Sequence, residues 1–214
     1  MIRILVIDDH PLVQAGLSHV FAEIEDIAIT GSAKDGEEAL KALAAAEFDV
    51  AILDISMPGK HGIEVLRDIG AENPTLPVLL YTRFPEEHYA VRTLRAGASG
   101  YLHKGADPDQ IIAAVRTLAS GGTYITPSVG ALLKEAVNRK REEASLEDLS
   151  DREYQIFQMI VTGKGSTQIA NELNLSVKTV STHRTRLLQK LALTTTADLV
   201  RFALRQGIDE TFVG

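Results

Sequence analysis

The first 120 residues alternate between two hydrophobic periods, and this alternation restricts the possible folds more than any other feature. Short apolar runs occur at residues 2–7, 27–33, 50–53, 78–81 and 100–102. Stretches with helical spacing lie between and after them, at 11–24, 37–46, 63–69, 87–96 and 108–120. Near-continuous apolar strands alternating with helices are typical of a parallel sheet covered on both faces. The pattern predicts an α/β domain with a five-stranded, doubly wound parallel sheet.

The rest of the chain has a different pattern. The stretch "SGGTYITPS" at 120–128 interrupts the alternation, and a charged stretch with little apolar content follows it. Helical spacing then returns at 151–162, 167–173, 177–191 and 196–206. We therefore predict an α/β domain at 1–122, a linker at 123–148 that begins as a helix, and a small all-α domain at 149–214.

Charge is distributed unevenly along the chain. The net charge is −8 for residues 1–125, −1 for 126–148 and +2 for 149–214. A weakly basic tail on an acidic body favours nucleic-acid contact by the tail. The absence of cysteine excludes disulfides and thiolate metal sites. With no signal-peptide pattern and no apolar run of about 18 residues, we expect a soluble, cytoplasmic protein with no membrane partner.

Carboxylates stand at the ends of two apolar runs. The run "ILVIDDH" delivers Asp8 and Asp9, and the run "VAILD" ends in Asp54. If the first and third strands are neighbours, the three side chains converge at the carboxyl edge of the sheet, where such folds bind ligands. Two charges about 4 Å apart repel by about 4 kcal/mol at an effective dielectric constant near 20. A hard divalent cation, Mg²⁺, relieves this repulsion, so we expect a magnesium site.

Two further strand ends carry polar side chains. Thr82 ends the fourth run, and Lys104 follows the fifth. A hydroxyl, an ammonium group, a cation and a carboxylate around one point are suited to phosphoryl transfer. Each residue alone is equally well explained as a helix cap or as filler, but their occurrence at successive strand ends favours a shared site.

The strings "VIDDH", "LDISMPGKHG", "LLYT" and "GYLHK" resemble the receiver domain of bacterial two-component response regulators, with its flavodoxin-like sheet. The resemblance covers residues 1–120, and "D-I-S-M-P-G" at 54–59 is its most specific part. It implies that Asp54 accepts a phosphoryl group from a sensor histidine kinase. It further implies a role for each of several residues: Mg²⁺ ligation by Asp8, Asp9, Asp54 and the Ser56 backbone carbonyl, phosphoryl contacts by Thr82 and Lys104, and an aromatic switch at Tyr101 that moves inward.

Two positions depart from the receiver pattern. Gly105 follows Lys104 where many receivers have proline, so no cis peptide is expected there. Arg83 stands where small residues are frequent in receivers, and its bulk is expected to restrict access to the phosphorylated aspartate.

The helical tail contains one helix with a polar, basic face. Ser150 and Glu153 form an expected capping box for the first helix, and Ser176 is the expected N-cap of the third. In residues 177–191 there are four basic residues and no acid. The inward positions expected from a helical wheel are Val177, Val180, Leu187 and Leu191. This pattern suits a helix that enters a DNA major groove, although the charge alone slightly favours a solvated face of an ordinary bundle.

The tail sequence from "LSDREYQIF" through "SVKTVSTHRTRLLQKL" resembles the LuxR-type helix-turn-helix. With the receiver before it, the chain is similar to NarL/FixJ-type response regulators. The resemblance implies seven DNA contacts: Ser181, Thr182 and Thr185 at base edges or nearby phosphates, and Lys178, Thr179, Arg184 and Arg186 at the DNA backbone.

Other residues of the tail have expected packing roles. Arg184 lies nearer the packing side than the other contacts, and His183 is expected to be packed and hydrogen-bonded instead of reading bases. The resemblance implies dimerisation through 196–206, with an apolar stripe that contains Ala197, Val200, Ala203 and Leu204.

Taken together, the sequence predicts a DNA-binding regulator that is phosphorylated on Asp54, dimerises and binds paired half-sites on double-stranded DNA. It is not expected to be an enzyme beyond its own aspartyl phosphorylation and dephosphorylation. A metal-dependent phosphohydrolase with Asp54 as nucleophile is disfavoured because no cap insertion or further acid–base pair is present. An atypical receiver that regulates DNA binding without phosphorylation remains the alternative, because of Arg83 and Gly105.

Overall fold

A computed structural model describes residues 1–57, 60, 62–138, 146–206 and 208. The chain divides into two units, Met1–Asn138 and Arg139–Gly214, which are described separately. The end of the "D-I-S-M-P-G" string, Pro58 and Gly59, lies outside the described residues, as do residues 139–145 of the expected linker.

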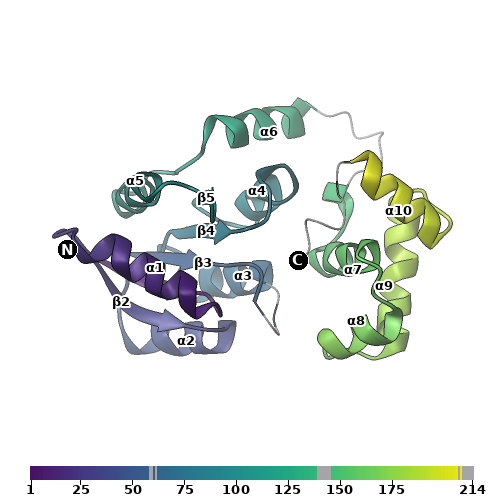
Figure 1. Cartoon of the computed structure of the whole chain (residues 1–214), viewed down its shortest axis with the longest axis horizontal. Coiled ribbons are helices and arrows are strands. Elements are labelled where there is room, and N and C mark those ends of the chain that lie inside the picture. The colour runs from purple at the N-terminus through teal and green to yellow at the C-terminus, as the bar shows by residue number, and fades with distance from the viewer. Residues whose placement is uncertain (58–59, 61, 139–145, 207, 209–214) are drawn as a thin grey trace. The chain divides into compact units, whose positions relative to one another are not determined.

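The first unit is built on a five-stranded parallel sheet with the order β2-β1-β3-β4-β5 (Figure 1). The strands are β1 (Ile2–Ile7), β2 (Ile27–Ala33), β3 (Val50–Leu53), β4 (Val78–Thr82) and β5 (Gly100–His103). The helices between and after them are α1 (Pro11–Ala22), α2 (Gly36–Ala45), α3 (Gly62–Glu72), α4 (Glu86–Arg95), α5 (Pro108–Ala119) and α6 (Pro127–Asn138).

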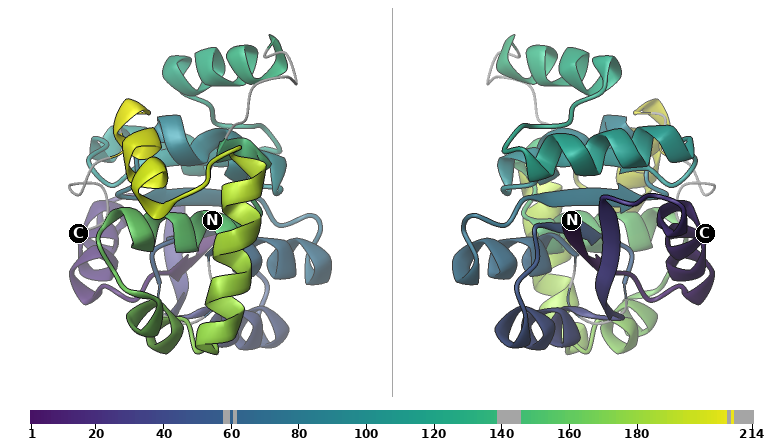
Figure 2. Two further views of the ribbon diagram at one scale, coloured as in Figure 1. Left: turned by 90° about the vertical axis from the view of Figure 1, so that its right-hand side faces the viewer. Right: turned by 90° about the vertical axis from the view of Figure 1, so that its left-hand side faces the viewer.

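Helices cover both faces of the sheet (Figure 2). On one face, side chains of β1 and β3 such as Ile4 and Ile52 share a buried cluster with Leu17 of α1 and with Ile111 and Val115 of α5. Strand side chains alternate between faces, so their neighbours point to the other helical layer. Every residue of β3 and β4 is buried, which explains why these strands are continuous apolar runs. The predicted fold class is confirmed.

The segment after α5 differs from the expected linker. The amide of Tyr124 donates to the Ser99 carbonyl at 3.0 Å, and Tyr124 forms a parallel bridge with Gly100. Helix α6 then packs against α4, and Figure 1 shows the two side by side. Residues 123–138 therefore belong to the first unit and do not form a solvated linker, because they bury a helix face on it.

The second unit is entirely helical where the structure describes it. It contains a 3₁₀ turn η1 (Leu146–Asp148) and the helices α7 (Asp151–Val161), α8 (Ser166–Glu172), α9 (Val177–Lys190) and α10 (Thr196–Arg205). The capping box of α7 forms as expected, since the Ser150 amide donates to Glu153 Oε2 at 2.8 Å and Ser150 Oγ accepts from the Glu153 amide. Ile156, Phe157 and Ile160 lie in the core of this unit, as their spacing predicts.

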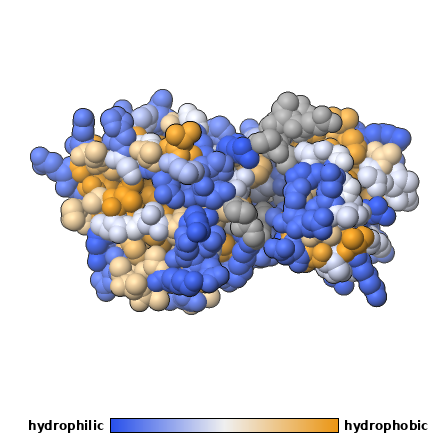
Figure 3. All heavy atoms as spheres, turned by 60° about the horizontal axis from the view of Figure 1, so that its bottom comes forward, coloured by the Kyte–Doolittle hydropathy of each residue, from blue (hydrophilic) through white to orange (hydrophobic). Residues whose placement is uncertain are grey.

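Hydrophilic side chains dominate the face drawn in Figure 3, and hydrophobic ones form separate patches on each unit. Among the described residues, no helix has the length and apolar character needed to cross a membrane.

Candidate functional site

The three predicted carboxylates meet at the carboxyl edge of the sheet. β1 pairs with β3 in parallel register, with Ile7 opposite Leu53, so the residues that follow each strand emerge together. Ligand atoms of Asp8, Asp9, His10 and Asp54 all lie within 4.8 Å of one another. The side chains of Asp8 and Asp54 are almost completely buried, and Asp9 is partly exposed. The predicted convergence is confirmed.

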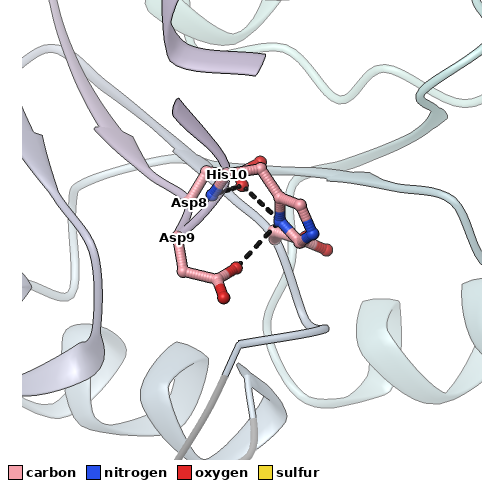
Figure 4. Close-up of side chains that lie close together, drawn as sticks. Asp8, Asp9 and His10 are labelled. Carbon is pink, nitrogen blue, oxygen red and sulfur yellow. Dashed lines mark hydrogen bonds and ion pairs between the residues drawn. The ribbon is translucent and has the colours of Figure 1, made fainter. Parts of the chain in front are cut away.

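Two basic side chains balance these acids. Lys104 Nζ lies 2.6 Å from Asp54 Oδ2 and 2.7 Å from Asp8 Oδ2, so it connects the ends of β1 and β3 to the end of β5. His10 Nδ1 lies 3.1 Å from Asp8 Oδ1 and 2.9 Å from Asp9 Oδ1, and Figure 4 shows the imidazole between the two carboxylates. The His10 amide also donates to Asp8 Oδ1 at 2.8 Å.

One oxygen of this cluster is suited to a cation. Asp9 Oδ1 is buried and accepts no hydrogen bond among the described residues, although His10 Nδ1 is at ion-pair distance from it. A buried carboxylate oxygen without a donor is costly unless a positive partner occupies its lone pairs. Oxygen ligands from two or three carboxylates match the preference of Mg²⁺, so the residues present fit this cation.

Thr82 and Ser56 complete the edge of the pocket. Thr82, the last residue of β4, is fully buried, and its Oγ1 lies 3.5 Å from the Phe84 amide as a long hydrogen bond. The Ser56 amide donates to Asp54 Oδ1 at 3.0 Å, which brings the Ser56 backbone to the pocket; its carbonyl remains a predicted ligand. The Arg83 side chain is exposed, so its predicted effect on access to Asp54 stays a prediction.

Two tyrosines border the lysine. Tyr101 is fully buried in the inward position, and its hydroxyl donates to the Phe84 carbonyl at 2.8 Å. Tyr81 donates to the Lys104 carbonyl at 3.3 Å, and burial raises the pKa of its phenol. No cis peptide occurs in the described part of the chain, as expected for the Lys104–Gly105 bond.

Sequence reasoning missed two residues of the pocket. His10 contacts both Asp8 and Asp9, and its position directly after them in the sequence is the signal that could have found it. Gln14, one turn into α1, donates from Nε2 to the Asp8 carbonyl at 2.6 Å. Its spacing from Asp8 carries no comparable signal, since this contact depends on how α1 packs.

The second unit contains a compact helix-turn-helix formed by α8 and α9. Leu173 ends α8, and Asn174 follows with a left-handed backbone (φ 52°), a conformation that asparagine tolerates. Ser176 Oγ then accepts from the Thr179 amide at 3.0 Å and begins α9 as its N-cap, as predicted. A turn this short holds the two helices close together, and they pack against each other.

The predicted DNA contacts lie on the open side of α9. Five of the seven predicted contacts are exposed, namely Lys178, Thr182, Arg184, Thr185 and Arg186. The other two, Thr179 and Ser181, are half-buried. Thr182 and Thr185 donate to the Lys178 and Ser181 carbonyls, each at 3.0 Å, so both hydroxyl oxygens still accept hydrogen bonds from outside. Their placement on one accessible face agrees with the helical wheel.

Several packing expectations in this unit need correction. Val177 is 45 % exposed because it is the first residue of α9, where fewer neighbours surround the helix, whereas Val180 and Leu187 are buried as expected. Arg184 is exposed, and its place nearer the packing side than the other predicted contacts stays a prediction. His183 is partly buried, but its Nδ1 has no hydrogen-bond partner among the described residues, and burial lowers the pKa of its imidazole.

The expected apolar stripe of α10 is only partly accessible. Ala203 is fully buried within the unit, because α10 packs against α7. Leu204 is 59 % exposed, Ala197 is exposed and Val200 is half-buried. Ala203 is therefore part of the core and is not available to a second molecule.

One ion pair holds the end of α9. Lys190 Nζ lies 2.7 Å from Glu153 Oε2 and 3.1 Å from the Asp148 carbonyl. The Glu153 side chain is only 4 % exposed, and hydrogen bonds from Lys190 and Ser150 keep the pKa of its carboxyl below the usual range despite burial. This pair joins α9 to the start of α7.

Comparison with known proteins finds two families. Residues 4–116 match the response regulator receiver domain, and residues 147–203 match the bacterial regulatory proteins of the luxR family.

Individual relatives match nearly the whole chain. The response regulator UvrY of Escherichia coli K12 is 35 % identical over 209 residues, covering 97 % of this chain and 96 % of UvrY. The response regulator GacA of Pseudomonas aeruginosa is also 35 % identical over 209 residues, covering 97 % of this chain and 98 % of GacA. A structure of RcsB from Salmonella enterica serovar Typhimurium, bound to a promoter with the phosphomimetic BeF₃⁻, is similar with a TM-score of 0.69 and 25 % identity, covering 94 % of this chain and 97 % of RcsB.

Proposed function

The chain belongs to the NarL/FixJ-type two-component response regulators, which join a receiver domain to a LuxR-type DNA-binding domain, and we propose that phosphorylation of Asp54 controls its activity. It is a DNA-binding transcriptional regulator. The proposal concerns the roles of individual residues, the binding of Mg²⁺ and the conformational switch. The observation that carries it is the meeting of the Asp54 carboxylate with Lys104, Asp8 and Asp9 at the carboxyl ends of β1, β3 and β5.

In the proposed reaction, an Asp54 carboxylate oxygen attacks the phosphorus of a phosphohistidine on a sensor kinase. The new P–O bond forms as the P–N bond breaks, and the imidazole leaves with the electron pair of that bond and takes a proton from solvent. Lys104 is already within 2.6 Å of Asp54 Oδ2, so its ammonium group is positioned to balance charge on the transferred phosphoryl oxygens. Attack of water on the acyl phosphate later releases inorganic phosphate and returns the Asp54 carboxylate.

Asp8, Asp9 and Asp54, together with the Ser56 carbonyl, would hold Mg²⁺. When bound, the cation neutralises negative charge that develops on the phosphoryl oxygens. Asp9 Oδ1, which accepts no hydrogen bond among the described residues, supports this assignment.

The proposed switch uses the end of β4. A phosphoryl group adds up to two negative charges to a pocket from which water is largely excluded. Among the described residues, Thr82 Oγ1 makes one hydrogen bond, a long one of 3.5 Å, so reorientation toward a phosphoryl oxygen costs little. Tyr101 is fully buried, and this inward position is the one that the proposed switch favours after phosphorylation.

The proposed output is binding of a homodimer to paired half-sites of double-stranded DNA. Lys178, Arg184 and Arg186 supply the positive charge for phosphate contacts, and Ser181, Thr182 and Thr185 supply hydroxyls for bases or phosphates. The kinase and the DNA would both be met in the cytoplasm.

The proposal is tested by comparing the full chain with its Asp54→Asn variant, each with a small phosphoryl donor and Mg²⁺. Phosphorylation is followed on a phosphate-affinity gel, and mass and operator binding are measured in the same samples. We expect the wild-type chain alone to gain one acid-labile phosphate, to dimerise and to bind DNA more tightly. A matched variant is Asp35→Asn, which keeps a side-chain acceptor for the N-cap of α2 and lies outside the pocket.

Two results would contradict the proposal. If the donor phosphorylates the chain but leaves its DNA affinity and its oligomeric mass unchanged, the phosphorylation-independent regulator is favoured. Multiple turnover of a phosphomonoester would instead favour a phosphohydrolase.

A further inference from the structure

The surface of α4 is covered by a later segment of the same chain. Helix α6 presents an amphipathic stripe whose members are buried or half-buried: Val129, Leu132, Leu133 and Ala136. Their spacing places them on one side of the helix, and α6 packs against α4. Val129 has no exposed surface at all. The face of α4 that α6 covers is therefore unavailable to another protein while α6 remains docked.

A polar clasp fixes the beginning of α6 to the beginning of α4. Glu86 is the first residue of α4, and its carboxylate accepts hydrogen bonds from the hydroxyls of Thr126 and Ser128. The Thr126 hydroxyl oxygen in turn accepts from the Val129 amide at 3.3 Å, within the first turn of α6. The Glu86 carboxylate thus accepts hydrogen bonds from one hydroxyl just before α6, that of Thr126, and from one in its first turn, that of Ser128. Hydrogen bonds to a charged acceptor are stronger than neutral ones, so the clasp is a specific attachment.

The clasp lies at the end of a short chain of contacts that begins in the phosphorylation pocket. Thr82, Phe84, Pro85 and Glu86 fall within five consecutive residues. The Phe84 amide reaches Thr82 Oγ1, and the Phe84 carbonyl accepts from the Tyr101 hydroxyl. The same hydroxyl lies 3.5 Å from the Pro85 carbonyl, and Pro85 is the residue that precedes α4. In the proposed switch, a change at Thr82 would pass through these contacts to the backbone that positions Glu86.

From this geometry we infer that residues 124–138 are the resident partner of α4, held by the Glu86 clasp, and that this docking transmits the state of the Asp54 pocket toward the DNA-binding unit. The transmission rests on the function proposed above. The docking does not, since it depends only on contacts within the first unit.

The docking is tested by hydrogen–deuterium exchange of the full chain, comparing the wild type with Glu86→Ala. We expect the amides of residues 129–136 to exchange about tenfold faster in the variant, as local opening becomes easier when a charged hydrogen-bond acceptor is lost. Ser128→Ala should have an effect in the same direction, and combining it with Glu86→Ala should add little because both remove the same contact. Glu87→Gln is the matched control: it removes an equal charge from the same turn at an exposed position and should leave α6 exchange unchanged. Equal exchange of α6 in the wild type and Glu86→Ala would overturn the docking.

The transmission is tested by adding BeF₃⁻ and Mg²⁺ to the wild type and to Glu86→Ala. We expect exchange to change both at residues 82–86 and in α6 of the wild type, and only at 82–86 in the variant. A change at 82–86 without a change in α6 would overturn the transmission and leave the proposed function intact. If exchange changes at neither place although a donor phosphorylates Asp54 in the same preparation, the transmission is also overturned. If the chain neither changes its exchange nor is phosphorylated, the proposed function is contradicted. In that case the comparison of the wild type with Glu86→Ala still decides the docking.

Discussion

At the scale of single residues, the pocket is defined by which carboxylate oxygens have donors and which do not. Asp54 and Asp8 share Lys104, and Asp8 also accepts from the His10 amide. Asp9 has a buried oxygen, Oδ1, that accepts no hydrogen bond among the described residues and has only His10 Nδ1 at ion-pair distance, 2.9 Å. Loss of Asp9 should therefore change cation binding more than it changes folding.

We predict that Asp9→Asn weakens binding of Mn²⁺, used as a probe for Mg²⁺, by at least about tenfold, since removing even an indirect partner of a metal costs that much. Electron paramagnetic resonance titration of free Mn²⁺ measures the change. Glu23→Gln, an exposed position at the end of α1, removes one negative charge elsewhere and should bind as the wild type does. Equal affinity in Asp9→Asn would show that Asp9 is not a ligand.

The imidazole of His183 should make the stability of the DNA-binding unit depend on pH. Burial lowers its pKa, with Arg152 and Arg186 acting in the same direction and Glu153 opposing them. An unfolded histidine titrates near pH 6.5, so between that pH and the lower folded pKa the unfolded state binds more protons. The free energy of unfolding of this unit should therefore have its full value above about pH 6.5 and should fall as the pH decreases below that value.

This pH dependence is measurable by urea unfolding at about pH 5.5 and about pH 7.5. These values bracket the pKa of histidine in the unfolded chain and lie above the range in which Glu153 titrates. Nuclear magnetic resonance signals from α7 and α9 separate this unit from His88 of α4, whose pKa burial also lowers. His183→Gln should reduce the difference between the two pH values. An unchanged difference would assign the effect to another group.

At the scale of elements, two attachments position the parts that act. The Glu153–Lys190 pair joins α7 to the end of α9, and the approach of Tyr124 to Gly100 brings the segment before α6 alongside β5. Both are contacts between residues far apart in the sequence.

We expect Lys190→Met to destabilise the second unit by about 1–2 kcal/mol, because a buried carboxylate loses a charged partner that is itself partly exposed. Lys178→Met, at the other end of α9, is the matched variant: it should change stability by less than about 0.5 kcal/mol. Urea unfolding of both variants provides the comparison. Similar stabilities for the two would mean that the Glu153–Lys190 pair does not hold α9.

We expect Gly100→Ala to destabilise the first unit by about 1–3 kcal/mol, as overpacking does. A Cβ at this position would lie 3.0 Å from the Tyr124 carbonyl oxygen and 3.0 Å from Leu79 Cδ1. Gly70→Ala in α3 places its Cβ in open space and should be neutral or stabilising, because alanine favours helix. The measurement is urea unfolding with hydrogen exchange of the Tyr124 amide, and slower or unchanged exchange in Gly100→Ala would contradict the packing argument.

At the scale of the whole molecule, an acidic unit with the phosphorylation pocket is joined to a unit that carries the basic face of α9. The acidic pocket and the basic face of α9 thus lie in two separate compact units of one chain. Local positive charge on α9 suffices for DNA contact although the chain as a whole carries −7.

If the phosphorylated chain binds as a homodimer, its affinity should depend on the helical phase of the half-sites. Half-sites about 10–10.5 base pairs apart, or a multiple of that, face the same side of DNA. Inserting about 5 base pairs between them should abolish cooperative binding, and inserting a full turn of about 10 should restore part of it. Gel-shift titrations with BeF₃⁻ measure this, and affinity that does not depend on spacing would indicate binding as independent monomers.

Most of the fold and the central acids were predictable from the sequence. Apolar runs fully buried on both faces, such as Val50–Leu53, have a pattern that little else explains, and strand ends automatically bring Asp8 and Asp54 to one edge. The helix starts at Ser150 and Ser176 were predictable because capping is a local interaction. Val177 and Ala203 were misjudged because periodicity indicates a face of a helix but not how far the neighbouring helices extend over it.

The sequence by itself determined the order of strands and helices, the carboxylate edge and the basic face of α9, since each follows from local periodicity or from chain direction in a parallel sheet. Only the tertiary structure decided that residues 123–138 join the first unit, that Glu86 holds Thr126 and Ser128, and that Lys104 meets Asp8 and Asp54. These contacts depend on how separately formed elements pack. Packing places residues about 40 positions apart within hydrogen-bonding distance, and no local pattern in the chain encodes that meeting.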